Sequence, residues 1–187
     1  MADSFLAQKL TSYTDPEHTS DTCRRPFCMV VDGQAWSVAA GRAWVWAVRG
    51  TSSHAPLDVP SPLVAKFLGA EPRAALEVDA KKLKEWAGPA TMNGSFDEDG
   101  QVLGVIFGKV LDLRRLAVLL DPIPFPKLIL WDMTDVLGIR SVGISAKGKW
   151  RGLLAAVDAE PTPDMQVFDA RPEGADAFDL MSQLTED

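Results

Sequence analysis

The residues between Gly143 and Trp150 have the glycine and lysine spacing of a phosphate-binding loop. The string GISAKGKW places Gly143, Gly148 and Lys149 in the pattern G-x-x-x-x-G-K. A nucleotide-binding loop then needs a Ser or Thr, whose hydroxyl holds magnesium, and a helix whose backbone amides face the phosphates. Trp150 stands at the hydroxyl position here, and the following segment WRGLLAAV is typical of a strand. The motif is therefore interpreted as a Lys-Gly hairpin turn, and nucleotide hydrolysis is not expected.

Side chains that bind metals or act as catalytic bases are few and poorly spaced. The order His18, Cys23, Cys28, His54 does not match the usual spacings of zinc ligands. The chain contains no G-x-S-x-G nucleophile motif, and the acidic run at 97–99 has the composition of a solvated turn. The sequence therefore predicts no metal, no cofactor and no enzyme active site.

Basic side chains provide the remaining chemical signal. Arg114 and Arg115 project from a predicted helix whose opposite face is apolar, a geometry that offers guanidinium groups to phosphates. Lys9 flanks the apolar stripe of the first predicted helix. Exposed helix faces also carry such charges for solubility alone, so both interpretations stay open at this point. The other clustered basic residues are Arg24 and Arg25 before Pro26, and Lys81, Lys82 and Lys84 on a further predicted helix.

Length and composition limit the class of protein. The 187 residues, 47% of them hydrophobic, suit one globular domain. No apolar run approaches the roughly 20 residues that cross a bilayer, and the N-terminus lacks the basic and apolar regions of a signal peptide. Two cysteines are too few for the disulfide framework of a small secreted domain. We therefore expect a cytoplasmic protein without a membrane span.

The net charge of −7 is concentrated at the C-terminus. Residues 158–187 hold nine Asp and Glu against one Arg, so they carry −8 and the rest of the chain carries +1. A nearly neutral body can still present one basic face to nucleic acid. We expect a domain over 1–157 and an acidic tail over 158–187. Within the tail, Phe178, Leu180, Met181 and Leu184 form either a short docking motif or part of a disordered solubilising segment.

The hydrophobic patterns predict an α+β fold with antiparallel sheets. Three strands follow a first helix, and three more follow a later helix capped by Asp112. In the stretch 51–89 between them we expect an irregular connection with one short helix, and then a second helix over 79–88. Residues 91–96 and 101–112 flank a turn at 97–100 and are expected to form a hairpin. The expected strands are 27–31, 35–40, 43–49, 127–133, 139–145 and 150–157, and the expected helices outside the insertion are 5–13 and 113–120.

The element order and several local strings together resemble the bacterial DNA polymerase sliding clamp family, a ring-shaped processivity factor. One unit of that family starts with a helix, passes an Arg-Pro turn and enters strands that end in a turn of small residues and glycine. The matching residues here are Arg25-Pro26-Phe27, Asp32-Gly33 and the string VAAGR at 38–42. The later half is similar too, with the strings GVIFGKV, LDLRRLAVLL, KLILWDM, IRSVGIS and GLLAAV. The resemblance covers about residues 4–158, interrupted by 51–89.

The resemblance implies a clamp-type unit with two helices on one side of antiparallel sheets, facing the central hole of a ring. Basic side chains would then touch duplex DNA loosely and without sequence preference. The implied DNA contacts are Lys9, Arg114 and Arg115, with Arg24 and Arg25 near the rim. By position, the apolar partner groove of the family corresponds to Gly41, Arg42, Trp44 and Leu154. The family usually has Asp where this chain has Ala40, and its turn is one residue longer.

Ring formation sets a further condition. The family chain carries three units and its ring has six, whereas 187 residues hold one unit. Six copies of this chain, or a ring shared with another clamp, would be required. We therefore expect a non-enzymatic DNA replication accessory that forms a homo-oligomer and has double-stranded DNA and replication proteins as partners. The alternative is an acidic interaction or inhibitor protein that has the clamp fold and does not bind DNA.

Overall fold

The computed structural model describes residues 9–50, 54–57, 61–71, 76–87, 102–121, 123 and 125–167. The strands are β1 (Phe27–Val31), β2 (Gln34–Ala40), β3 (Trp44–Arg49), β4 (Leu76–Asp79), β5 (Leu103–Ile106), β6 (Lys109–Asp112), β7 (Lys127–Asp132), β8 (Ser141–Ala146), β9 (Trp150–Ala155) and β10 (Gln166–Val167). The helices are η1 (Leu10–Tyr13), α2 (Asp21–Arg24), α3 (Pro62–Gly69), α4 (Ala80–Ala87), α5 (Leu113–Leu120) and α6 (Thr134–Leu137).

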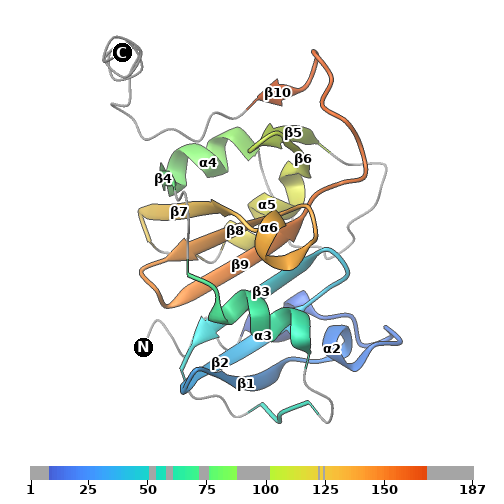
Figure 1. The fold of residues 1–187 in the computed structure, drawn as a ribbon, viewed down its shortest axis with the longest axis vertical. Helices are drawn as coiled ribbons and strands as arrows, with labels where there is room; N and C mark the ends of the chain where they lie inside the picture. The colour runs from blue at the N-terminus through green and yellow to red at the C-terminus, as the bar shows by residue number, and fades with distance from the viewer. Residues whose placement is uncertain are drawn as a thin grey trace.

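The strands form two sheets (Figure 1). The large sheet has seven strands in the order β1-β2-β3-β9-β8-β7-β4, and the small sheet has three in the order β10-β5-β6. Every pairing between two described strands of the large sheet is antiparallel. This arrangement confirms the predicted α+β class with antiparallel sheets.

Tight turns with positive φ connect the hairpins. Asp32-Gly33 joins β1 to β2, and Lys147-Gly148 joins β8 to β9. This is the conformation that two-residue hairpins favour, and it confirms the interpretation of the Gly143–Lys149 string as a hairpin. The Trp131 ring packs directly against Gly143. A side chain at this position would clash with it, since a Cβ would come within 2.0 Å of Trp131 Nε1.

The expected hairpin around 97–100 requires a correction. The stretch 101–112 is not one strand, because β5 and β6 form a hairpin within it and turn at Phe107-Gly108, where φ is 53° and 72°. Gly108 is a common turn residue but Phe107 is not, so the dipeptide gives only a weak turn signal. The Phe107 side chain packs against the hydrophobic core, which explains an aromatic residue at this position. Residues 91–96, the expected partner strand, lie outside the described residues.

Each face of the large sheet has its own hydrophobic core. On one face, which we call the α5 face, β-strand residues pack against η1, α4, α5 and the small sheet. On the other, the α3 face, Phe27, Trp36 and Trp131 pack with residues of α3 and α6. The resemblance implied helices on one side, and η1 and α5 do share a face. Helices α3 and α6 add a layer on the opposite face.

Segments expected to lie outside the unit are built into the sheets. Within the expected insertion 51–89, β4 pairs with β7 at the edge of the large sheet, and α4 packs beside α5. Helix α3 begins where Ser61 Oγ accepts from Val64 N at 3.4 Å, with a Pro in the first turn. Beyond residue 158, where we expected the tail to begin, β10 pairs in parallel with β5. The described chain thus remains part of the fold as far as Val167.

A buried tyrosine–tryptophan pair fixes the position of α5. The Tyr13 and Trp46 rings stack with centroids 5.0 Å apart, and Trp46 meets Trp150 edge-on. The Tyr13 hydroxyl donates to Val118 O at 3.1 Å, and Trp46 Nε1 donates to Leu119 O at 3.2 Å. Both acceptors are carbonyls of the last turn of α5, where helix carbonyls run out of partners within the helix. Val118 O also accepts from the backbone N–H of Asp121 at 3.3 Å. Burial raises the pKa of Tyr13, and the charge of Asp121 raises it further, so the hydroxyl stays protonated and able to donate.

Replacing Tyr13 by Phe tests this pair. The variant keeps the ring but removes the donor to Val118 O, so we expect the free energy of unfolding to fall by about 1 kcal/mol. Urea denaturation followed by tryptophan fluorescence measures the change. Thr11→Ala, at an exposed position of the same helix, is the control and should leave stability unchanged. Equal stability of Tyr13→Phe and the native chain would show that the hydroxyl does not hold α5.

An ion pair joins the small sheet to the large one. Lys109 Nζ lies 2.5 Å from Asp132 Oδ2 and 3.3 Å from Phe107 O, and its side chain is only 9% exposed. Asp132 also bonds to the first residue of α6, because its Oδ1 accepts from Thr134 N and Thr134 Oγ1. Burial raises the pKa of Asp132, but the hydrogen bonds from Lys109 and Thr134 outweigh it, and the net effect is a lowered pKa.

The lowered pKa of Asp132 gives a pH-dependent prediction. The charged carboxylate stabilises the fold above its unfolded-state pKa, and this stabilisation is lost as the pH falls through the lower folded-state value. Asp132→Asn should therefore cost about 1–2 kcal/mol at pH 7, a figure reduced because Asp132 is partly exposed. Urea titrations across pH should show this difference shrinking below roughly pH 4. Asp135→Asn, an exposed change on the same helix, is the control, and a pH-independent cost of Asp132→Asn would contradict the assignment.

Candidate nucleic-acid interface

Helix α5 presents one arginine to solvent and holds the next against its own N-terminus. Asp112 caps the helix by accepting from Arg114 N at 3.1 Å, and its other carboxylate oxygen lies 3.5 Å from Arg115 Nε. The predicted apolar face is buried, with Leu113 and Leu116 each 1% exposed. Arg114 is consequently exposed and Arg115 half-buried, on the side of α5 that faces away from the sheet.

Helix α4 supplies lysines beside these arginines. Asp79 Oδ1 accepts from the backbone amides of Lys81 and Lys82, and Leu83 is fully buried, so both lysine side chains point outward. Lys81 Nζ lies 3.9 Å from Glu85 in a solvent-exposed pair, which adds little stability. The helix predicted over 79–88 is confirmed over Ala80–Ala87, while residue 88 lies outside the described residues. Its position next to α5 was not foreseen, because it follows from the pairing of β4 with β7.

The α5 face therefore carries a set of basic residues, which we call the basic helix layer. Lys9, the N-cap of η1, is half-buried at its border. Of the expected helix over 5–13, only residues 9–13 are described. Asp112, Glu85 and Asp121 partly offset the positive charge of the layer. Its members are Lys9, Lys81, Lys82, Arg114 and Arg115.

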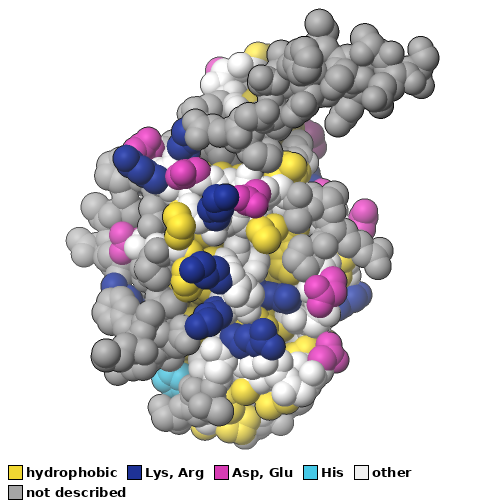
Figure 2. All heavy atoms as spheres, turned by 90° about the vertical axis from the view of Figure 1, so that its left-hand side faces the viewer, with side chains coloured by type: hydrophobic (Ala, Val, Ile, Leu, Met, Phe, Trp, Pro, Cys, Tyr) yellow, Lys and Arg dark blue, Asp and Glu magenta, His cyan; other side chains and the backbone are white. Residues whose placement is uncertain are grey.

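A further basic group lies where β3 ends and β8 turns into β9. Arg49 N donates to Lys149 O at 2.7 Å, and Lys147 Nζ lies 5.4 Å from the centre of the Phe125 ring. Figure 2 shows Lys and Arg side chains gathered in a band on this side of the molecule, with Asp and Glu at its borders. No local pattern connects Arg49 with Lys147 and Lys149, because it is the pairing of β3 with β9 that brings them together.

Arg24 and Arg25, the expected rim contacts, have partners within the chain. Arg24 forms an ion pair with Asp21 in α2. The Arg25 guanidinium donates to Ala55 O at 3.1 Å and to Pro56 O at 3.0 Å. Arg25 thereby holds residues 54–57 beside β1, a structural task that the sequence did not indicate.

The residues of the expected partner groove come together around a turn. Gly41 N donates to Trp44 O at 2.9 Å, and a Cβ on Gly41 would come within 2.2 Å of the Trp44 ring. Trp44 pairs with Leu154 across β3 and β9, but Leu154 is only 1% exposed and belongs to the core of the α5 face. Arg42 is exposed, and its Nε donates to His18 Nε2 at 3.0 Å. At the expected partner groove, only the Arg42 side chain and part of the Trp44 side chain are therefore accessible to a partner.

Other expectations concern metals, membranes and the tail. Within the described residues, no group of three His, Cys, Asp or Glu side chains is placed to hold a metal ion. Both cysteines are free thiols, with Cys23 buried and Cys28 half-buried. None of the described helices is long and apolar enough to span a bilayer. The tail docking residues Phe178, Leu180, Met181 and Leu184 lie outside the described residues, so their role stays a prediction.

Comparison by sequence finds no relative: no protein-family model and no curated protein matches this chain. Comparison by structure does find similar proteins. A protein described as a DNA polymerase III beta subunit from Eubacterium rectale superposes with a TM-score of 0.58 at 8% identity, over 84% of this chain and 63% of its own. The DNA polymerase III subunit beta of Pseudomonas aeruginosa gives 0.56 at 10% identity, over 85% and 66%. The beta sliding clamp of C. crescentus gives 0.56 at 8% identity, over 84% and 64%.

These similarities concern the fold. The identities are too low to carry residue roles across, and the match spans less than two thirds of the length of each of these proteins. What agrees is the arrangement of antiparallel sheets and helices that the element order had suggested. The chain therefore has a fold of the bacterial sliding-clamp type.

Proposed function

We propose that this chain is a non-enzymatic accessory of DNA replication that binds duplex DNA, without sequence preference, through the basic helix layer. The supporting observation is that η1, α4 and α5 share one face of the large sheet and carry Lys9, Lys81, Lys82, Arg114 and Arg115. The similar structures include DNA polymerase III beta subunits and sliding clamps, which makes DNA the first partner to test.

The chemistry of the layer suits contact with the DNA backbone. Lys and Arg pair with phosphate oxygens, which are the same in every sequence, and long flexible side chains keep such contacts loose. Affinity then comes mainly from the release of counterions, so it falls as the salt concentration rises. A protein bound in this way can slide along a duplex.

Assembly would enclose the DNA. The large sheet ends in β1 on one side and β4 on the other, and exposed edge strands can pair with another chain. Head-to-tail contacts of this kind close into rings when the rotation per copy allows it. By the resemblance, six units make such a ring, so we propose a homo-oligomer that also binds replication proteins.

Charge reversal on the helix layer tests DNA binding. Arg114→Glu and Lys82→Glu should each weaken binding to any duplex and reduce the slope of log affinity against log salt by about one. Lys66→Glu is the matched control, because it makes the same charge change on α3, on the opposite face of the sheet. Fluorescence anisotropy with a labelled duplex at several salt concentrations measures both quantities.

Two results would contradict the proposal. One is an equal loss of affinity in Lys66→Glu and Arg114→Glu, which would mean that the α5 face has no special part in binding. The other is the absence of duplex binding at low salt together with a monomeric mass by light scattering, instead of about six times the 20.3 kDa of one chain. That second outcome would favour an interaction or inhibitor protein with a clamp-type fold.

A further inference from the structure

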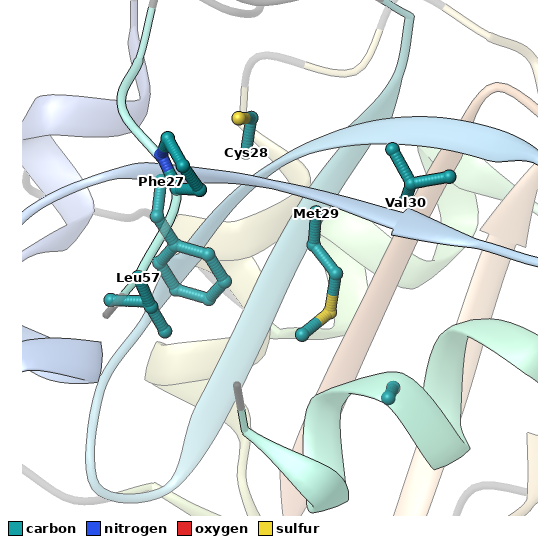
Figure 3. Close-up of a pocket in the computed structure, with 7 residues that line it drawn as sticks. Phe27, Cys28, Met29, Val30 and Leu57 are labelled. Carbon is teal, nitrogen blue, oxygen red and sulfur yellow. The ribbon is translucent and has the colours of Figure 1, made fainter. Parts of the chain in front are cut away.

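A hollow of about 470 Å³ lies at the free edge of β1 (Figure 3). Phe27, Met29 and Leu57 point to the side of β1 where α3 contributes Ala65, whereas Cys28 and Val30 point to the other side. The hollow therefore follows the strand edge and has apolar side chains on both sides of it. A segment lying along this edge would contact both sets.

The strand edge itself offers unpaired backbone groups. Cys28 N donates outward to Ala55 O at 3.3 Å, so residues 54–57 cover the first part of β1. Outward and inward backbone groups alternate along an antiparallel strand, and Val30, two residues on, therefore also points its N–H and C=O away from β2. Val30 is 70% exposed and has no strand beside it among the described residues. An extended peptide can pair with these groups as an added strand.

Positive charge borders the hollow. The Arg25 guanidinium lies at Pro56, and Lys66 follows Ala65 on the exposed side of α3. Asp32 lies at the far end of β1, near Gly69 of α3. The part of the edge next to Arg25 and Lys66 thus suits an apolar segment with acidic neighbours.

The C-terminal segment of this chain has that composition. In the string AFDLMSQL at 177–184, Phe178 and Leu180 alternate with Asp179, so an extended backbone places both apolar side chains on one side. Residues 168–187 hold six Asp and Glu against one Arg. The last described strand before this segment, β10, lies at the opposite end of the long axis of the molecule from β1 (Figure 1). This separation favours the segment of a neighbouring copy over that of the same chain.

We propose that residues 177–184 of one copy bind along β1 of a second copy as an added strand, with Phe178 and Leu180 in the hollow. The hydrogen bonds to Val30 set the extended conformation, the hollow selects apolar side chains, and Arg25 and Lys66 attract the acidic flanks. The contact joins copies head to tail. It specifies one link of the proposed oligomer and does not depend on DNA binding.

Peptide binding to the full-length chain tests the proposal. The receptor carries Phe178→Ser and Leu180→Ser, so that its own tail does not compete, and the probe is a fluorescein-labelled peptide of residues 172–187. We expect saturable binding by anisotropy. Adding Val30→Pro to the receptor removes the outward N–H without removing a bond to β2, and should weaken binding at least about tenfold. Val30→Thr keeps the N–H and is the matched control, with binding unchanged.

A second receptor variant guards against misfolding of Val30→Pro. Ala65→Glu places a negative charge at the hollow on the surface of α3 and should also weaken binding, with circular dichroism confirming the fold. Absence of peptide binding, or binding unaffected by both variants, overturns the proposal. Loss of binding in Lys82→Glu but not in Val30→Pro would also overturn it, because the tail would then lie on the basic helix layer. Duplex binding measured on the same variants reports separately on the proposed function, which survives if only the peptide fails to bind.

Discussion

The placement of the basic residues depends on how the last turn of α5 is held. Tyr13 and Trp46 stack in the core and donate to the carbonyls of Val118 and Leu119, so one buried pair joins η1, the large sheet and the C-terminal end of α5. Without these donors Val118 O would keep only the hydrogen bond from Asp121 N, and Leu119 O would lose its bond to Trp46, a loss that is costly wherever water cannot replace it. With them, α5 has one orientation on the sheet. Arg114 then faces solvent at the other end of the helix, and α4 packs alongside.

The basic residues of this chain fall into two groups. Some are bonded to backbone carbonyls and support the fold, and others are exposed on the basic helix layer. The Arg25 guanidinium donates hydrogen bonds to the carbonyls of Ala55 and Pro56. Arg151 lies between the rings of Trp36 and Trp131 and donates to Leu68 O and Ala70 O, thereby fixing α3 on its face of the sheet. Burial lowers the pKa of Arg151, as expected for a guanidinium used to support the fold. In the basic helix layer, by contrast, Lys81, Lys82 and Arg114 are exposed to solvent.

Local sequence patterns predicted individual helices, strands and turns well, but they predicted poorly which of these elements pack side by side. The cap at Asp112, the buried stripe of α5 and the turns at Asp32-Gly33 and Lys147-Gly148 are set by nearby residues, and the sequence indicated each of them. The turn at Phe107-Gly108 was not predicted, because the residue with positive φ before the glycine is an aromatic one that packs against the core. The place of α4 beside α5, and of Arg49 beside Lys149, depends on strand pairing between distant segments. A single sequence contains no direct signal for such pairings, so the place of Lys81 and Lys82 in the basic helix layer could not be predicted.

The central claim is that duplex DNA lies against η1, α4 and α5 and not against the opposite side of the sheet. Lysine acetylation followed by mass spectrometry, with and without duplex DNA, tests this residue by residue. We expect DNA to protect Lys81 and Lys82 while Lys66, exposed on α3 across the sheet, reacts as fast as before. Protection of Lys66 with unchanged reactivity of Lys81 and Lys82 would contradict it.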